Sequence, residues 1–234
     1  MFRWTWLCGL LVYGLCAPAQ EVDLKAEVAW KAGAPKTNHR TKRDVVMWLV
    51  PAAPLQEPSP ASGLQLIQRN KSFEPHVMVV PVGSVVQFPN RDPFFHNVFS
   101  LFEGKRFDLG LYEAGSTRDV RFDKPGVSYI FCNIHSEMSA VVIALQTPFH
   151  AISDARGRLT IPRVPVGRYR LHLWYEAALP EELDAMARDI TVAEDTPNLG
   201  VLALKVAERP KTHQNKYGQE YEPPTPGSPA YVKP

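Results

Sequence analysis

Short apolar segments separated by turn residues recur along residues 63–145, and this recurrence constrains the fold more than any other feature of the chain. Glycine, proline and asparagine lie between the segments, and no helical apolar period is present among them. Many short strands joined by such turns are typical of an all-β sandwich or barrel. The predicted strands are Gly63–Gln68, His76–Val80, Ser84–Phe88, Asn97–Leu101, Thr117–Phe122, Gly126–Phe131 and Ala140–Leu145.

Further predicted strands lie on both sides of this region. Val22–Trp30 and Asp44–Val50 precede it, and Arg168–Tyr175 follows it with a clean alternation of apolar and polar side chains. Pro180–Ala187 predicts a short helix. The composition changes after Thr147, where we place a domain boundary. The prediction is a first β domain at 20–146, a small β-sandwich at 147–206 and an extended or disordered Pro-rich tail at 207–234.

The first 19 residues have the pattern of a secretory signal peptide. Arg3 supplies a positive charge, Leu7–Cys16 is a short apolar run, and Ala17-Pro18-Ala19 resembles a cleavage site. The alternative is a membrane anchor, but the run is about half of the roughly 20 residues that a span needs. We expect cleavage near Ala19, a periplasmic or secreted protein and no stable membrane span. The formal net charge of +2 gives no reason to expect a nucleic-acid partner.

Cleavage would leave Cys132 as the only cysteine of the mature chain. A single cysteine cannot form an internal disulfide, and an exposed free thiol is a liability in an oxidising compartment. Cys132 is therefore either buried and inert or protected by a metal. It begins the motif Cys132-x2-His135-x2-Met138, which lies between two predicted strands. A second histidine, His96, lies at the end of another strand.

These four residues predict a mononuclear type 1 (blue) copper site. Two imidazoles and a thiolate in one plane, with a weak axial thioether, suit both Cu(I) and Cu(II). Each residue alone has a simpler explanation, because a histidine is often at the surface and a buried cysteine or methionine often just fills the core. Their joint occurrence at strand ends favours one copper ion bound by His96, Cys132, His135 and Met138.

The sequence resembles bacterial cupredoxins of the plastocyanin and amicyanin type over residues 22–146. The amicyanin-type loop is also Cys-x2-His-x2-Met, and its remote histidine also begins a His-Asn-Val string, as at His96-Asn97-Val98. The resemblance implies a cupredoxin-like Greek-key β-sandwich with His96, Cys132 and His135 as equatorial ligands and Met138 as the axial ligand. One departure is Ser136-Glu137, where such loops usually have proline; we expect the carboxylate to raise the pKa of His135.

Residues 147–206 resemble the carboxypeptidase-regulatory-like domain, a small Ig- or prealbumin-like β-sandwich. The matching strings are Asp154-x2-Gly157-Arg-Leu-Thr-Ile and Val164-Pro-x-Gly167-x-Tyr169. No zinc or peptidase signature accompanies them. Near the metal, we expect the Asn97 side chain to hydrogen-bond across to the copper loop near Asn133, the alternative being a simple turn cap.

The leading functional hypothesis is a single-electron carrier between redox proteins, for example a c-type cytochrome or a dehydrogenase. The alternative is a copper-binding module for buffering, delivery or assembly. A copper enzyme is a third hypothesis, but a multicopper oxidase needs His-x-His pairs and a binuclear site needs two loop cysteines, and the sequence has neither. We therefore predict no enzymatic activity. The five other histidines are predicted surface or packing residues: His39, His76, His150, His172 and His213.

Overall fold

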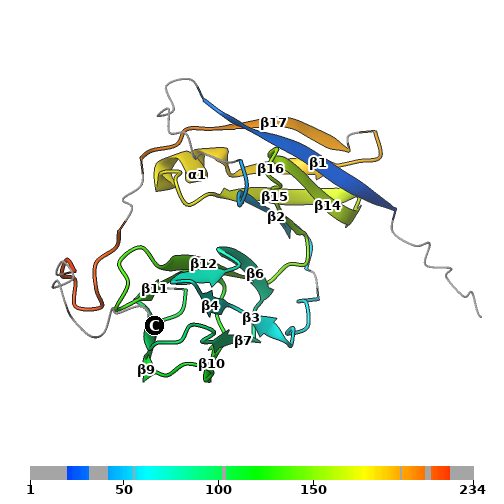
Figure 1. Ribbon diagram of the computed structural model, residues 1–234. Coiled ribbons are helices and arrows are strands. Elements are labelled where there is room, and N and C mark those ends of the chain that lie inside the picture. Colours follow the sequence, from blue (N-terminus) through cyan, green and yellow to red (C-terminus); the bar gives the residue numbers. More distant parts are fainter. Residues whose placement is uncertain are drawn as a thin grey trace, which may run out of the picture.

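The computed structural model describes residues 20–31, 42–54, 56–101, 104–195, 197–208 and 212–221. Within them the chain forms two β-sandwiches, each made from two main sheets, and Figure 1 shows one sandwich stacked on the other. The predicted all-β fold class is thereby confirmed. The predicted signal peptide lies outside the described residues. No helix within the described residues has the length and apolar character that crossing a membrane requires.

The first unit, which we call the central sandwich, spans residues 64–145. A five-stranded sheet in the order β6-β12-β11-β8-β9 faces a three-stranded sheet in the order β10-β7-β3, with the hairpin β4-β5 beside them. Alternating side chains such as Val86, Phe88 and Ile130 are fully buried between the sheets. The strands are β3 (Leu64–Gln65), β4 (Ile67–Arg69), β5 (Ser72–Glu74), β6 (Val77–Pro81), β7 (Ser84–Pro89), β8 (His96–Ser100), β9 (Phe107–Tyr112), β10 (Thr117–Phe122), β11 (Gly126–Cys132) and β12 (Ser139–Leu145).

The second unit, the composite sandwich, combines both ends of the described chain. One sheet has the order β14-β1-β17 and the other β13-β2-β15-β16, and a single short helix, α1, follows β15. The elements are β1 (Glu21–Trp30), β2 (Val46–Pro51), β13 (His150–Ile152), β14 (Arg158–Pro165), β15 (Gly167–Trp174), α1 (Pro180–Met186), β16 (Arg188–Val192) and β17 (Asn198–Leu204).

This strand pairing differs from the predicted division at residues 20–146 and 147–206. β1 lies between β14 and β17, and β2 lies between β13 and β15, so the first two strands belong to the second sandwich. Their apolar side chains, Leu24, Val28 and Leu49, share a core with Leu171. The physical reason is that the alternation within a strand shows which of its faces is buried, but not which sheet the strand joins. The central sandwich is therefore an insertion between β2 and β13.

The two sandwiches are joined by a packed apolar layer. Val46 and Trp174 of the composite sandwich form one apolar cluster with Val77, Val141 and Ile143, which lie on the outer face of the five-stranded sheet. That sheet is consequently buried on both faces, which explains why every residue of β12 after Ser139 is buried. The layer fixes the central sandwich, and with it the loop after β11, relative to the rest of the chain.

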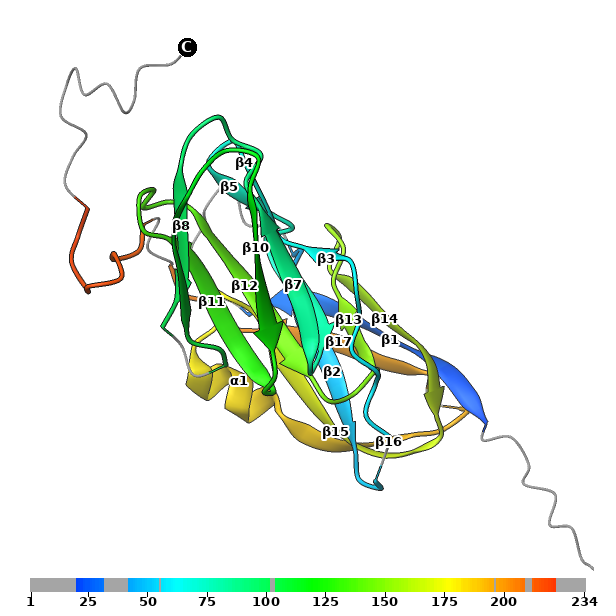
Figure 2. The same ribbon diagram turned by 90° about the horizontal axis from the view of Figure 1, so that it is seen from below.

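Residues 212–221 depart from the predicted tail. After β17 the chain runs to the end of the central sandwich, where this segment lies beside β8 and β11 (Figures 1 and 2). It is held there by hydrogen bonds such as His213 N–H to the Ser136 carbonyl, 3.0 Å. The predicted extended or disordered tail gave no indication of these contacts, because proline-rich composition does not reveal side-chain contacts to a distant loop.

Candidate metal centre

Three neighbouring strands bring the predicted ligands to one end of the central sandwich. β11 pairs with β8, opposing Cys132 to Val98, and β11 pairs with β12, opposing Phe131 to Ser139. His96 begins β8 and Cys132 ends β11, so their side chains meet at the same edge. The loop between β11 and β12 then supplies His135 and Met138.

The donor atoms of three predicted ligands lie close together. Within the described residues, His96, Cys132 and His135 form a group in which all the ligand atoms are within 4.8 Å of one another. Cys132 Sγ is 3.5 Å from Nδ1 of His96 and 3.5 Å from Nδ1 of His135. Two donors bonded to one metal at about 2.0–2.3 Å, roughly 110–120° apart, are separated by about 3.6 Å. The spacing therefore fits one shared ion.

Met138 lies beside this group on the same short loop. Its side chain is 1% exposed and packs in the core cluster that contains Cys132. Its backbone N–H donates to the His135 carbonyl at 3.0 Å, and its carbonyl accepts from Cys132 N–H at 3.2 Å. The loop is thus closed on itself by its own main chain, which places the thioether at the buried side of the site.

A buried carboxylate supports His96 from behind. Nε2 of His96 lies 2.9 Å from Oδ2 of Asp92, and the two side chains are 0% and 4% exposed. Since Nδ1 faces Cys132, the imidazole has one nitrogen toward the metal position and the other toward a carboxylate. Such a carboxylate fixes the tautomer and orientation of a metal-binding histidine and makes it a stronger donor.

The hairpin turn between β4 and β5 holds Asp92 in place. Asn70 N–H donates to Oδ1 at 2.6 Å and Lys71 N–H donates to Oδ2 at 3.0 Å. Asn70 and Lys71 both have positive φ, 53° and 56°, as a tight two-residue hairpin turn requires. Burial raises the pKa of Asp92, but the hydrogen bonds from Lys71, His96 and Asn70 outweigh it and hold that pKa below its usual value.

Burial also controls the protonation of the ligands. It raises the pKa of the Cys132 thiol, although backbone N–H groups of Asn97, Ile134 and His135 donate to the sulfur and oppose the shift. Burial lowers the pKa of His96, against the opposing effect of Asp92. Both histidines are therefore neutral at pH 7 and available as ligands, and a metal cation would compete with the thiol proton.

The pKa of His135 is shifted downward, to about 4. The main cause is burial, followed by the nearby His96 and Lys71. The expectation that Glu137 would raise this pKa is wrong, because the Glu137 side chain is exposed and does not contribute to the shift. Solvent screens an exposed carboxylate, whereas loss of hydration acts directly on the imidazole.

The shift of His135 predicts a pH dependence for the metal-free protein. Between pH 6.5 and about 4 the unfolded state binds a proton at this histidine and the folded state does not, so acidification favours unfolding. We expect the urea midpoint to fall as the pH is lowered through this window. The fall should be smaller in His135→Gln, which removes the titrating group. Equal slopes for the two proteins would contradict the assignment.

The two predicted asparagines act differently from the expectation. The Asn97 side chain donates to Asp108 Oδ1 at 2.7 Å rather than to the copper loop. It is the Asn97 carbonyl that meets the loop, accepting from Asn133 N–H at 2.7 Å. The Asn133 side chain instead accepts from Lys216 N–H at 2.8 Å. The cross-loop contact is thus made by the backbone, since the strand pairing already aligns it.

Aromatic rings cover part of the site. The Phe94 ring lies 5.3 Å from the ring of His96 and 5.6 Å from that of His135, measured between centroids. Phe95 points to solvent and is 52% exposed, so it does not shield the ligands as its neighbour does. His135 itself is partly exposed, which leaves one imidazole at the molecular surface.

The supporting roles of two residues were not predicted from the sequence. Asp92 lies between two predicted strands, yet its position four residues before His96 is a local signal that could have identified it. His213 was predicted as a surface or packing residue, and its ring stacks on Phe131 at 4.4 Å. No local pattern indicates that contact, because the two residues are far apart in the chain.

No protein-family model and no curated protein matches this chain. Among solved structures it is similar to a purple cupredoxin from Nitrosopumilus maritimus, with 24% identity, a TM-score of 0.33 and coverage of 35% of this chain and 99% of that one. It is also similar to a Cu-containing nitrite reductase from Thermus scotoductus, with 24% identity, a TM-score of 0.35 and coverage of 43% of this chain and 25% of that one. A third similar structure is a methionine-to-alanine variant of amicyanin in the Cu(I) form, with 18% identity, a TM-score of 0.34 and coverage of 42% of this chain and 98% of that one.

Proposed function

We propose that this chain is a blue copper protein that carries single electrons between redox partners in the periplasm or outside the cell. One copper ion would be held by His96, Cys132 and His135, with Met138 as the axial ligand. The observation that carries the proposal is the 3.5 Å spacing of one sulfur and two imidazole nitrogens in a buried, internally hydrogen-bonded site.

The residues of this site keep the ligands in place without help from a partner. His96 is fixed by Asp92, the loop is closed by the hydrogen bonds between Cys132 and Met138, and the sulfur receives backbone N–H groups. A copper ion would supply a one-electron couple, because nitrogen and sulfur donors in this arrangement suit both of its oxidation states. Rigid ligands keep the geometry unchanged when an electron enters or leaves.

His135 is the proposed point of electron entry and exit. Its ring is partly exposed and lies beside Phe94, next to the exposed Phe95. A redox protein such as a c-type cytochrome or a dehydrogenase could therefore approach this imidazole closely. We propose no catalytic role, since electron transfer of this kind makes and breaks no bond in a substrate.

Loss of the thiolate is expected to abolish the visible colour. With Cu(II) added, the wild-type chain should show an intense blue thiolate-to-copper band, and Cys132→Ser should lack it. Glu137→Gln is the matched control, because Glu137 is an exposed non-ligand of the same loop and its replacement should leave the band unchanged. A colourless wild-type chain that binds no copper would overturn the proposal.

Electrochemistry separates the carrier from a copper-delivery module. A carrier should cycle reversibly at an electrode and retain its copper over many reductions. Ready loss of the metal on reduction would instead favour buffering or delivery. The Asp92 carboxylate and the closed loop support retention, because both hold the ligands in either oxidation state.

A further inference from the structure

Residues 212–221, which we call the C-terminal strap, bind the metal-ligand loop at four successive points. His213 N–H donates to the Ser136 carbonyl at 3.0 Å, and the His213 ring lies 3.2 Å from the His135 carbonyl through Nε2. Lys216 N–H donates to the Asn133 side chain at 2.8 Å. The strap therefore contacts the backbone carbonyls of two predicted ligands. His213 lies beside the carbonyl of His135, and Tyr221 donates to the carbonyl of Cys132.

Tyr221 makes the contact nearest to the sulfur ligand. Its hydroxyl donates to the Cys132 carbonyl at 2.7 Å, across 89 positions of the chain. Its ring packs edge-on against His213 at 5.4 Å, and His213 in turn stacks on Phe131. Packing of the Tyr221 ring against His213 directs the hydroxyl at the Cys132 carbonyl, and such an outer hydrogen bond helps to orient a metal-binding residue.

The strap is a built element rather than a passing tail. The Asn215 side chain accepts from Tyr217 N–H at 2.9 Å and from Gln219 N–H at 3.0 Å, which closes a turn. Gly218 has φ of 76°, a conformation that glycine adopts without strain. The strap therefore meets the loop with its own shape already set, and little chain entropy is lost in each contact.

A charged contact ties the strap to the strand that carries the other histidine. Lys216 Nζ lies 2.6 Å from Asp108 Oδ2, and Asp108 Oδ1 accepts from the Asn97 side chain. Asn97 follows His96 in β8, so the strap spans from the loop ligands to the strand of the remote ligand. These contacts hold the pKa of Asp108 below its usual value, despite the opposing effect of burial.

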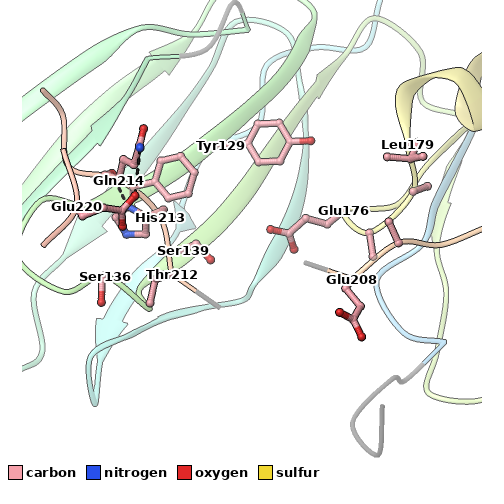
Figure 3. A pocket seen from close by; sticks show the side chains of 14 residues that line it. Tyr129, Ser136, Ser139, Glu176, Leu179, Glu208, Thr212, His213, Gln214 and Glu220 are labelled. Carbon is pink, nitrogen blue, oxygen red and sulfur yellow. Dashed lines mark hydrogen bonds between the residues drawn. The ribbon is translucent and has the colours of Figure 1, made fainter. Parts of the chain in front are cut away.

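The hydrogen bonds described above join the strap to the metal-ligand loop and to the strands beside it. A cavity of about 620 Å³ lies between the strap and the composite sandwich, lined on one side by His213, Gln214 and Glu220 and on the other by Glu176 and Leu179 (Figure 3). Gln214 and Glu220 hydrogen-bond to each other at 3.1 Å across the strap. Hydrogen bonds to the metal-ligand loop and the ion pair with Asp108 hold the strap against the central sandwich.

We propose that the C-terminal strap clamps the ligand loop, with Tyr221 and Lys216 as positioning residues that hold Cys132 and Asn133. The inference rests on the proposed copper site for its functional meaning. The clamp keeps the loop carrying Cys132, His135 and Met138 closed in both redox states and so retards metal release. The strap follows β17 in the sequence, so a segment that comes after the composite sandwich would support the copper centre.

The test compares four chains: the wild type, a chain ending at Glu208, Tyr221→Phe and the matched control Tyr169→Phe, which removes a hydroxyl that donates to the Pro165 carbonyl at 2.7 Å within the composite sandwich. Ending at Glu208 preserves Ala207 and its hydrogen bond to Ala177 in the composite sandwich. Copper transfer to a chelator should be about 10–100-fold faster in the shortened chain and about tenfold faster in Tyr221→Phe. Tyr221→Phe should also shift the reduction potential, and Tyr169→Phe should change neither quantity.

Amide hydrogen exchange of the metal-free chains tests the clamp independently of copper. Backbone amides of residues 132–138 should exchange faster in the shortened chain, while those of β7 and β15 stay protected. Unchanged exchange together with unchanged copper release would overturn the clamp and leave the copper function standing. Faster exchange in a chain that shows no blue band would support the clamp and overturn the copper function.

Discussion

Asp92→Asn is expected to weaken copper binding by about 10–100-fold, the range typical for the loss of an outer hydrogen-bond partner of a metal ligand. The two oxygens of Asp92 accept from Asn70 N–H, Lys71 N–H and His96 Nε2. An amide has only one oxygen and presents N–H groups to these donors. At least one buried donor then loses its partner, which costs about 1–3 kcal/mol of stability.

The same substitution should raise the reduction potential. A neutral partner makes the His96 imidazole a weaker donor, and this disfavours Cu(II) more than Cu(I). Isothermal titration with copper, urea unfolding and voltammetry measure the three effects. Asp123→Asn is the matched control, because Asp123 is exposed in the same sandwich and pairs with Lys105 at the surface. An Asp92→Asn protein with wild-type affinity and potential would show that the carboxylate is not coupled to the site.

The individual strands could be predicted well because their information is local. Thr117–Phe122 forms β10 with the predicted bounds, and the alternation in Arg168–Tyr175 places Tyr169, Leu171 and Leu173 in one core. β9 was not predicted, since Asp108 and Gly110 interrupt its apolar pattern and Gly110 has a φ of 66°. Polar residues and a glycine break the apolar alternation of β9, so its pattern does not predict a strand even though it pairs with β8.

The residues of the site likewise fall into those that the sequence reveals and those that only the fold reveals. Cys132 and His135 were predicted from their spacing on one loop, and His96 from its His-Asn-Val string at a strand end. The structure brings these three residues together. Met138 is buried beside Cys132, and its axial role stays a prediction. Asp92 lies only four residues before His96, so its contact with that ligand has a local signal in the sequence. Tyr221 lies 89 positions from Cys132, and no pattern along the chain reveals its contact.

The partnership of β1 is the part of the fold that most needs a direct test, and Leu24→Asp provides it. Leu24 is fully buried between the sheets of the composite sandwich. Losing the side chain of a buried leucine costs about 2–5 kcal/mol, and burying an unpaired carboxylate adds several more. Together these approach the total stability of a typical domain, about 5–15 kcal/mol. We therefore expect the composite sandwich to unfold.

The strands whose amides lose exchange protection distinguish the two domain divisions. If β1 completes the composite sandwich, amides of β14, β15 and β17 lose their exchange protection, while the central sandwich keeps its protection and its copper band. If residues 20–146 formed one domain, the loss would fall on the central sandwich and its metal site instead. Lys25→Asp is the matched control, since Lys25 lies on the exposed face of β1 and the change should leave both sandwiches folded. The central sandwich can survive this damage because its own core, with Phe88, Phe122 and Ile130, contains no residue of β1 or β2.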